Sequence, residues 1–182
     1  MHGKRGAAVA ALAMAMAVGV TGCGGNANGT GAAGPTSAAP RPAGAGPLTK
    51  AVVQADIDSS VVDAGTPPAD PDWAAMADRG RGKGCVIAYM GYGAEGAPAG
   101  VPQYEALVRE LKERGWEQSG RRKERRAEDE ARTVIDVQTV LAQRGWSVTT
   151  EYRAGTGQGE VKAMAFDVAC AKKAGLDENP VG

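Results

Sequence analysis

A tract of small residues from Gly24 to Pro47 sets the strongest limit on what this chain can fold into. It contains almost only Gly, Ala, Asn, Thr, Ser and Pro, plus Arg41, and no apolar side chain except the proline rings is larger than alanine. Such a segment cannot bury enough apolar surface to offset the entropy lost on ordering. We therefore expect a flexible tether, then a single domain over 48–174 and a flexible tail over 175–182.

The residues before the tether have the parts of an export signal over 1–22. Lys4 and Arg5 supply a positive start. The apolar run Ala7–Val20 is shorter than the about 20 residues that a membrane-spanning helix needs. We therefore expect a cleaved signal peptide rather than a membrane span.

The run Val20-Thr21-Gly22-Cys23 resembles the lipobox of bacterial lipoproteins, whose usual form is Leu/Val, Ala/Ser/Thr, Gly/Ala and Cys. The resemblance implies cleavage before Cys23 and a diacylglycerol (palmitate-type) anchor on its thiol, so that residues 23–47 form a lipidated tether. It implies a lipid-anchored protein on the extracytoplasmic face of the cell membrane, because paired acyl chains hold a protein stably. The alternative is an ordinary signal peptide with a chance cysteine.

The cysteine count then predicts a disulfide. The chain has three cysteines, and Cys85 and Cys170 remain once Cys23 carries lipid. Disulfides persist in an oxidising compartment, and two cysteines allow a single connectivity. We expect a Cys85–Cys170 bond that closes a loop of more than 80 residues and contributes about 4 to 5 kcal/mol. The alternative is two buried free thiols.

Histidine and charge exclude several classes of function. The only histidine, His2, lies in the expected signal, which excludes Ser-His-Asp and Cys-His catalysis and histidine-ligated zinc. Asp56, Asp58 and Asp63 suggest calcium, but Val61 stands where an EF-hand loop needs glycine. Lys and Arg number 21, as do Asp and Glu, so no strong field favours nucleic acid. We expect no metal, no cofactor and no nucleic-acid partner.

Apolar spacing predicts a mixed α and β domain. Leu48–Val62 has roughly helical spacing, Asp70 caps a short helix through Met76, and Gln103–Arg114 has the clearest amphipathic pattern. The predicted strands are Cys85–Met90, one beginning at Trp116, Trp146–Arg153 and Val161–Cys170. With its cysteines paired, the first of these strands would lie beside the last and antiparallel to it.

Residues 131–144 allow two interpretations. Arg-Gly-Trp occurs at Arg114–Trp116 and again at Arg144–Trp146, and a repeated unit would make 131–144 a second helix in a β-α-β-α-β-β order. However, six of the nine residues from Thr133 to Leu141 are β-branched, which favours a strand and a hairpin. The hairpin interpretation gives an α+β fold, a mostly antiparallel sheet with Gln103–Arg114 across one face.

This layout resembles the small, uncharacterised lipoproteins of actinobacteria. The shared features are the lipobox, the tether, the helix-Gly-Trp step, the second Gly-Trp and a cysteine closing the last strand. The resemblance implies no known activity.

The segment Gly91–Val101 is the candidate contact loop. Its start, Gly-Tyr-Gly-Ala-Glu-Gly, matches the G-x-G-x-x-G pattern after a strand, but Pro98 and Pro102 precede the helix and argue against dinucleotide binding. We expect a long mobile loop, and the simpler interpretation is a plain connector. The candidate contact residues are Gly91, Tyr92, Gly93 and Glu95.

Two further groups of residues have structural interpretations. The basic run Arg121–Arg126 is followed by acidic residues 128–130, which favours a solvated hairpin tip over a binding patch. Trp73, Trp116 and Trp146 are more typical of a core than of a sugar-stacking surface.

We therefore expect a membrane-anchored envelope lipoprotein with a non-enzymatic binding role toward another envelope protein or a wall polymer. One alternative is a carboxylate-dependent cell-wall glycan hydrolase, which needs two acids about 5 to 10 Å apart. The other is a substrate-capture lipoprotein for a transporter.

Overall fold

The computed structural model describes residues 46–77, 79 and 82–175. The expected signal, Cys23, most of the expected tether and most of the expected tail lie outside the described residues. The described elements, in chain order, are α1 (Lys50–Asp63), α2 (Pro71–Ala77), β1 (Val86–Tyr92), α3 (Val101–Glu113), β2 (Glu117–Gln118), β3 (Lys123–Arg126), β4 (Val134–Gln143), β5 (Trp146–Arg153), β6 (Glu160–Asp167) and α4 (Val168–Lys173). No helix in this part of the chain is both long enough and apolar enough to span a membrane.

Both helices predicted ahead of the sheet are confirmed, and each begins at a side-chain cap. The Thr49 hydroxyl accepts a hydrogen bond from the Val52 amide at 3.4 Å, where α1 starts. The Asp70 carboxylate accepts one from the Asp72 amide at 2.8 Å, with Pro71 in the first turn of α2. These caps satisfy amides that the helices cannot pair internally.

The clearest predicted helix is confirmed as α3, which begins two residues earlier than expected, at Val101. Pro102 is tolerated there because the first turn of a helix does not use its amide hydrogens. The Gln103 side chain accepts a hydrogen bond from the Gly100 amide at 3.1 Å and so caps the same turn.

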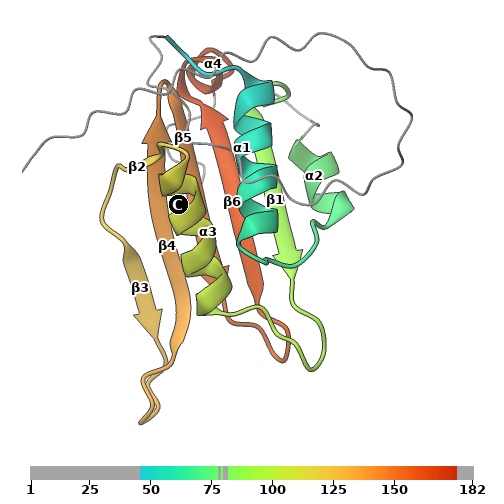
Figure 1. The fold of residues 1–182 in the computed structure, drawn as a ribbon, viewed down its shortest axis with the longest axis vertical. Helices are drawn as coiled ribbons and strands as arrows, with labels where there is room; N and C mark the ends of the chain where they lie inside the picture. Colours follow the sequence, from blue (N-terminus) through green and yellow to red (C-terminus); the bar gives the residue numbers. More distant parts are fainter. Residues whose placement is uncertain (1–45, 78, 80–81, 176–182) are drawn as a thin grey trace, which may run out of the picture. The chain divides into compact units, whose positions relative to one another are not determined.

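The described strands form a six-stranded antiparallel sheet in the order β1-β6-β5-β4-β2, with β3 pairing further along β4 (Figure 1). β1 lies beside β6, with Val86 opposite Phe166 and Tyr92 opposite Glu160. The predicted α+β class is confirmed. The main helix α3 lies across one face, and α1 packs beside it (Figure 1).

Residues 131–144 hold a strand, so the hairpin interpretation is confirmed and the second helix is wrong. β4 and β5 pair along their length and are joined by Arg144 and Gly145. These two residues have φ of 44° and 88°, as a type I′ turn requires. The β-branched side chains of β4 thus outweigh the repeated Arg-Gly-Trp as a guide to the fold.

The two faces of the sheet differ, and we name them here. The covered face packs against α1 and α3, and alternate residues of β5 lie buried on it: Trp146, Val148, Thr150 and Tyr152. Where α3 meets β4, the Tyr104 hydroxyl donates a hydrogen bond to Thr139 Oγ1 at 2.6 Å, so the polar group at this contact is paired. The intervening strand residues form the open face, which α1 and α3 do not cover.

The last strand is shorter than predicted. The strand expected over Val161–Cys170 ends at Asp167, and the next six residues form α4. The Asp167 carboxylate accepts a hydrogen bond from the Cys170 amide at 2.9 Å, so an N-cap replaces strand pairing at this point. Cys170 therefore lies on a helix and not in the sheet.

Cys85, just before β1, is nevertheless joined to Cys170, with Cα atoms 5.4 Å apart. The bond closes a loop with a sequence separation of 85 residues, for which chain entropy predicts a stabilisation of about 4 to 5 kcal/mol. The bond stabilises the fold in part by restricting the unfolded chain, because it joins two cysteines that are far apart in sequence.

The domain begins at the same end of the sheet as the disulfide. The Leu48 amide donates a hydrogen bond to the Arg144 carbonyl at 3.3 Å, and Trp146 Nε1 donates one to the Leu48 carbonyl at 2.9 Å. The Val168 amide of α4 donates to the Gly145 carbonyl at 3.0 Å. We call this the disulfide end, defined by Gly46–Leu48, Cys85, Arg144–Gly145 and Val168–Lys173.

Candidate functional site

The opposite end of the sheet carries the candidate contact loop, and we call it the loop end. It comprises Tyr92–Gly100 and Arg153–Glu160. The loop predicted from Gly91 was placed too early, because Gly91 and Tyr92 are the last residues of β1, and Val101 already belongs to α3. The residues between form a turn closed by paired hydrogen bonds between Ala94 and Ala97.

Two glycines let the loop after β1 pack tightly against the turn between β5 and β6. The Gly93 amide donates to the Gly159 carbonyl at 3.0 Å, and the Ala99 amide donates to the Gln158 carbonyl at 2.8 Å. A Cβ at Gly93 would overlap the Ala99 backbone, and Gly159 adopts a φ of 63° with the Ala99 carbonyl against it. The loop expected to be mobile is thus tied to the β5–β6 turn by backbone hydrogen bonds.

A row of side chains crosses the open face at the loop end. Cross-strand pairing places Tyr92 opposite Glu160, Glu160 opposite Arg153, Arg153 opposite Asp136 and Asp136 opposite Arg125. Directly opposed residues of antiparallel strands point to the same side. We call Tyr92, Glu160, Arg153, Asp136 and Arg125 the end row.

The charges of the end row alternate in sign and pair with one another. Arg153 lies 3.4 Å from Asp136 and 3.9 Å from Glu160, and Arg125 lies 3.7 Å from Asp136. Arg153 is also 2.6 Å from Glu151, in the neighbouring row. The Glu151 charge, together with the Asp136 and Glu160 carboxylates, raises the pKa of Arg153 above its ordinary value, although desolvation opposes the shift. The row therefore offers neither a free acid nor a free base.

Glu151 is the most buried acid of this network. Its side chain is 7% exposed and pairs with Lys162 at 2.8 Å as well as with Arg153. The Lys162 ammonium lies 6.0 Å from the centre of the Trp73 ring, which comes from α2. Two cations around one buried acid compensate its desolvation, which suits a structural role.

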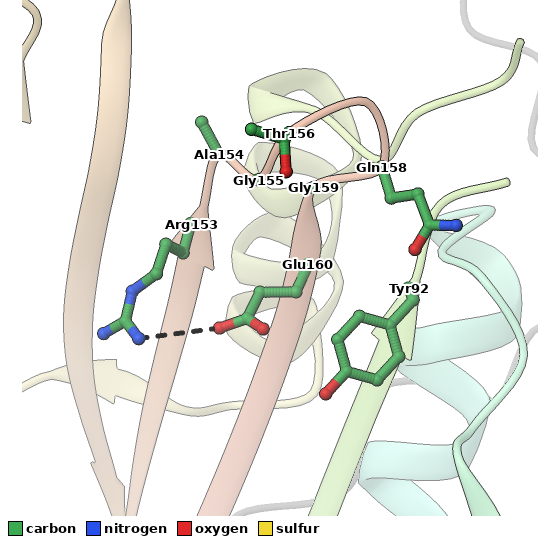
Figure 2. A pocket seen from close by; sticks show the side chains of 8 residues that line it. All are labelled: Tyr92, Arg153, Ala154, Gly155, Thr156, Gln158, Gly159 and Glu160. Carbon is green, nitrogen blue, oxygen red and sulfur yellow. Dashed lines mark ion pairs between the residues drawn. The ribbon is translucent and has the colours of Figure 1, made fainter. Parts of the chain in front are cut away.

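A hollow of about 200 Å³ opens beside the end row. It is lined by Tyr92, Arg153, Ala154, Gly155, Thr156, Gln158, Gly159 and Glu160. Figure 2 shows the Glu160 carboxylate between the Arg153 guanidinium and the Tyr92 ring. Tyr92 is 45% exposed, one of the few large apolar side chains of the described residues that face solvent.

A second hollow, of about 320 Å³, adjoins the first and shares Ala154, Gly155 and Gly159 with it. Its other lining residues include Pro98 and Tyr152, and none of the lining residues is charged. Burial raises the pKa of Tyr152 above its ordinary value. The hydroxyl therefore stays neutral at physiological pH and can donate or accept a hydrogen bond.

The other candidate contact residues are only partly brought together. Tyr92 and Gly93 belong to the loop end, Gly91 directly precedes it in β1, and Tyr92 alone of the three lines a hollow. Glu95 is exposed on the turn and lines neither hollow. Cys23 lies outside the described residues.

The three aspartates considered for calcium point to different partners. Trp116 Nε1 donates to Asp56 at 3.2 Å, Gln54 donates to Asp58 at 2.8 Å, and Asp63 pairs with Arg114. Among the described residues no three His, Cys, Asp or Glu side chains gather into a set that could hold a metal ion.

Residues 123–126 of the basic run form the exposed edge strand β3, and the acidic residues 128–130 lie in the connection between β3 and its antiparallel partner β4. Arg122 pairs with Glu105 and Glu124, and Arg126 also pairs with Glu124. Although desolvation opposes the shift, these arginines lower the pKa of Glu124 below its ordinary value. Charged side chains on an edge strand also discourage pairing with another sheet.

Two of the three tryptophans are core residues, as predicted. Trp116 and Trp146 are 1% and 2% exposed. Trp73 is partly buried and packs over Lys162 at the β1 side of the open face.

Among the lining residues that were not predicted, four have polar or charged side chains: Arg153, Thr156, Gln158 and Glu160. They lie at and beside the β5–β6 turn, and nothing in the local sequence marks this turn as a site. The missing signal was register, because the Cys85–Cys170 pairing implies that the end of β1 meets the start of β6. A register that places Cys85 directly opposite Cys170 would have misaligned β1 and β6. The Cys85 carbonyl instead accepts a hydrogen bond from the amide of Asp167, three residues before Cys170.

Comparisons with protein-family models, with curated proteins and with solved structures found no match to this chain.

Proposed function

We propose that this chain is a lipid-anchored protein of the cell envelope, held at the extracytoplasmic face through Cys23, and that it binds an envelope component at its loop end without catalysis. The observation that carries the binding role is the combination of an exposed aromatic ring, Tyr92, with a hollow whose charged lining residues already neutralise one another. Such a site offers contact surface and hydrogen bonds rather than a reactive group.

The position of the loop end supports this role. The domain enters at the disulfide end, where Leu48 bonds Arg144, so a tether from Cys23 would attach there. β5 runs from Trp146 at that end to Arg153 at the other. Its eight residues span about 25 Å. A protein tethered in this way presents the loop end away from its point of attachment.

The charge pairs favour binding over the glycan hydrolase alternative. A hydrolase needs one protonated and one ionised acid facing a common bond. Here Glu95 stands exposed on a turn, whereas Glu151 is buried and paired with both Arg153 and Lys162, so the two acids do not face a common cleft. Reproducible cleavage of a wall glycan, lost when one carboxylate is removed, would overturn the non-enzymatic role.

The anchor is tested with Cys23→Ala expressed in the native cells. We expect the variant to remain unprocessed or to be shed, because no thiol is left to carry the diacylglycerol. Detergent partition and the size of the mature chain are the measurements. Unchanged processing and partition would refute the anchor.

The binding role is tested with detergent-washed envelopes, so that retention reflects contact and not the lipid. We expect Tyr92→Ala to lower retention of the full chain about tenfold, since one aromatic anchor often dominates a small contact. Val168→Ala is the matched control, because Val168 is 46% exposed and lies at the disulfide end. Equal retention of wild type and Tyr92→Ala would refute a loop-end site.

A further inference from the structure

The loop end selects against strongly charged ligands. Every charged residue that lines the first hollow has an opposite partner, with Arg153 2.6 Å from Glu151 and Glu160 3.9 Å from Arg153. An anion would have to compete with three carboxylates for Arg153, and a cation would meet Arg153 beside Glu160. The chemistry of the hollow therefore fits a neutral ligand.

Tyr92 supplies a flat apolar surface in a fixed position. It ends β1 opposite Glu160, and the next residue, Gly93, is bonded to Gly159. The ring is thus held by the sheet on one side and by the packed glycines on the other. The negative face of an aromatic ring attracts the weakly positive hydrogens of C–H groups, and the C–H face of a sugar ring presents such hydrogens.

The rim of the hollow supplies hydrogen-bonding groups suited to hydroxyls. The Thr156 hydroxyl and the Gln158 amide can each donate and accept, and neither side chain has a hydrogen-bond partner among the described residues. The Glu160 carboxylate, 20% exposed, adds an acceptor next to the Tyr92 ring (Figure 2). A hydroxyl both donates and accepts, so several hydroxyls on one ligand match this mixture.

The size of the site favours one unit of a polymer. A volume of about 200 Å³ is smaller than the about 300 Å³ at which enclosed small-molecule sites begin. The hollow is open, and the second hollow continues from it across Gly155 and Gly159. A chain of sugar units passing over the β5–β6 turn would occupy both.

We propose that the loop end binds a neutral polysaccharide chain, with one sugar ring stacked on Tyr92 and its hydroxyls bonded by Thr156, Gln158 and Glu160. The proposal rests on the binding role given above and names the class of ligand for that site. The second hollow, whose lining includes Tyr152 and Pro98 and carries no charged residue, takes the next unit.

The test is calorimetric titration of the full chain in detergent with two neutral probes, chitohexaose and maltohexaose, and one anionic probe, hexagalacturonate. We expect at least one neutral probe to bind, and its affinity to change by less than about twofold between about 50 and 500 mM salt, because no ion pair forms with the ligand. Tyr92→Ala should weaken this binding about tenfold or more. Tyr92→Phe, which keeps the ring, should stay within about threefold of wild type.

Val168→Ala is the matched control and should bind as wild type does. Binding of hexagalacturonate alone, falling steeply with salt, would overturn the proposal in favour of an anionic ligand. No heat with either neutral probe would overturn it as well. If Tyr92→Ala still loses retention on envelopes in that case, the binding role survives and only the ligand class is wrong.

Discussion

The two faces of one sheet are built from neighbouring residues but by different physics. On the covered face, Leu141 and Val148 are fully buried under α3 and α1. On the open face, Val140 and Thr149, each one residue away, are opposite one another and only partly buried. The strand period of two sends successive side chains to these different surroundings.

Charged side chains are also buried to different extents on the two sides of the sheet. Arg114, at the C-cap of α3, has 6% of its side chain exposed and pairs with Asp63 and Glu110, whereas Arg153 is 53% exposed and shares three carboxylates. Burial makes each charge on the helix side dependent on its partner, while water supports the charges of the end row. The largest fully buried side chains thus lie on the helix side of the sheet, whereas Tyr92 and Arg153 on the open face are exposed to solvent.

Substitutions at two adjacent residues of β4, one on each face, should differ most in their effect on the free energy of unfolding. We expect Leu141→Ala to lower the free energy of unfolding by about 3 to 4 kcal/mol, because it leaves a cavity in a closed core. Val140→Ala should lower it by about 1 kcal/mol or less, since its surroundings are already part water. Urea unfolding measures both, and equal losses would show that the open face is packed as tightly as the covered one.

Substituting one arginine on each side of the sheet tests whether buried ion pairs contribute more to stability than exposed ones. Arg114→Ala should cost about 2 to 3 kcal/mol, because Asp63 and Glu110 would be left partly buried without their cation. Arg153→Ala should cost about 1 kcal/mol or less, since Glu151 keeps Lys162 and the remaining acids are hydrated. The free energy of unfolding of each variant, measured with and without added salt, checks this prediction. A larger loss of stability for Arg153→Ala than for Arg114→Ala would contradict it.

The smallest expected effect is on the stability of the fold at alkaline pH. Burial raises the pKa of Tyr89 and of Tyr104 above the ordinary value, so folding favours their neutral forms. This contribution is fully present below about pH 10, the value for unfolded tyrosine, and is lost as pH rises through the folded values. Tyr104→Phe should cost about 1 kcal/mol at neutral pH, through the lost Thr139 hydrogen bond, yet show a shallower alkaline decline.

Urea unfolding at neutral pH and just above pH 10 is the measurement for this prediction. Tyr92→Phe serves as the control, because its ring is exposed on the open face. If Tyr104→Phe declined with pH as steeply as wild type, burial of Tyr104 would not be a source of the alkaline sensitivity.

Much of the fold could be predicted because it follows from local patterns. The apolar spacing of α3, the Asp70 cap of α2 and the alternation of β5 each reflect periodicity or a single hydrogen bond. The β-branched residues of β4 likewise indicated a strand against the repeated Arg-Gly-Trp. One prediction failed at the end of the last strand. Cys170 was expected to lie in that strand, but the Asp167 side chain caps a helix there and Cys170 belongs to the helix.

The sequence by itself determined the α+β class, the pairing of Cys85 with Cys170, and the buried face of α3. Those features depend on side-chain period and on the count of cysteines, which are properties of the chain. Only the tertiary structure decided that Tyr92, Arg153 and Glu160 share one hollow and that their charges cancel. Strand register makes those contacts, and a shift by one residue would send each side chain to the other face.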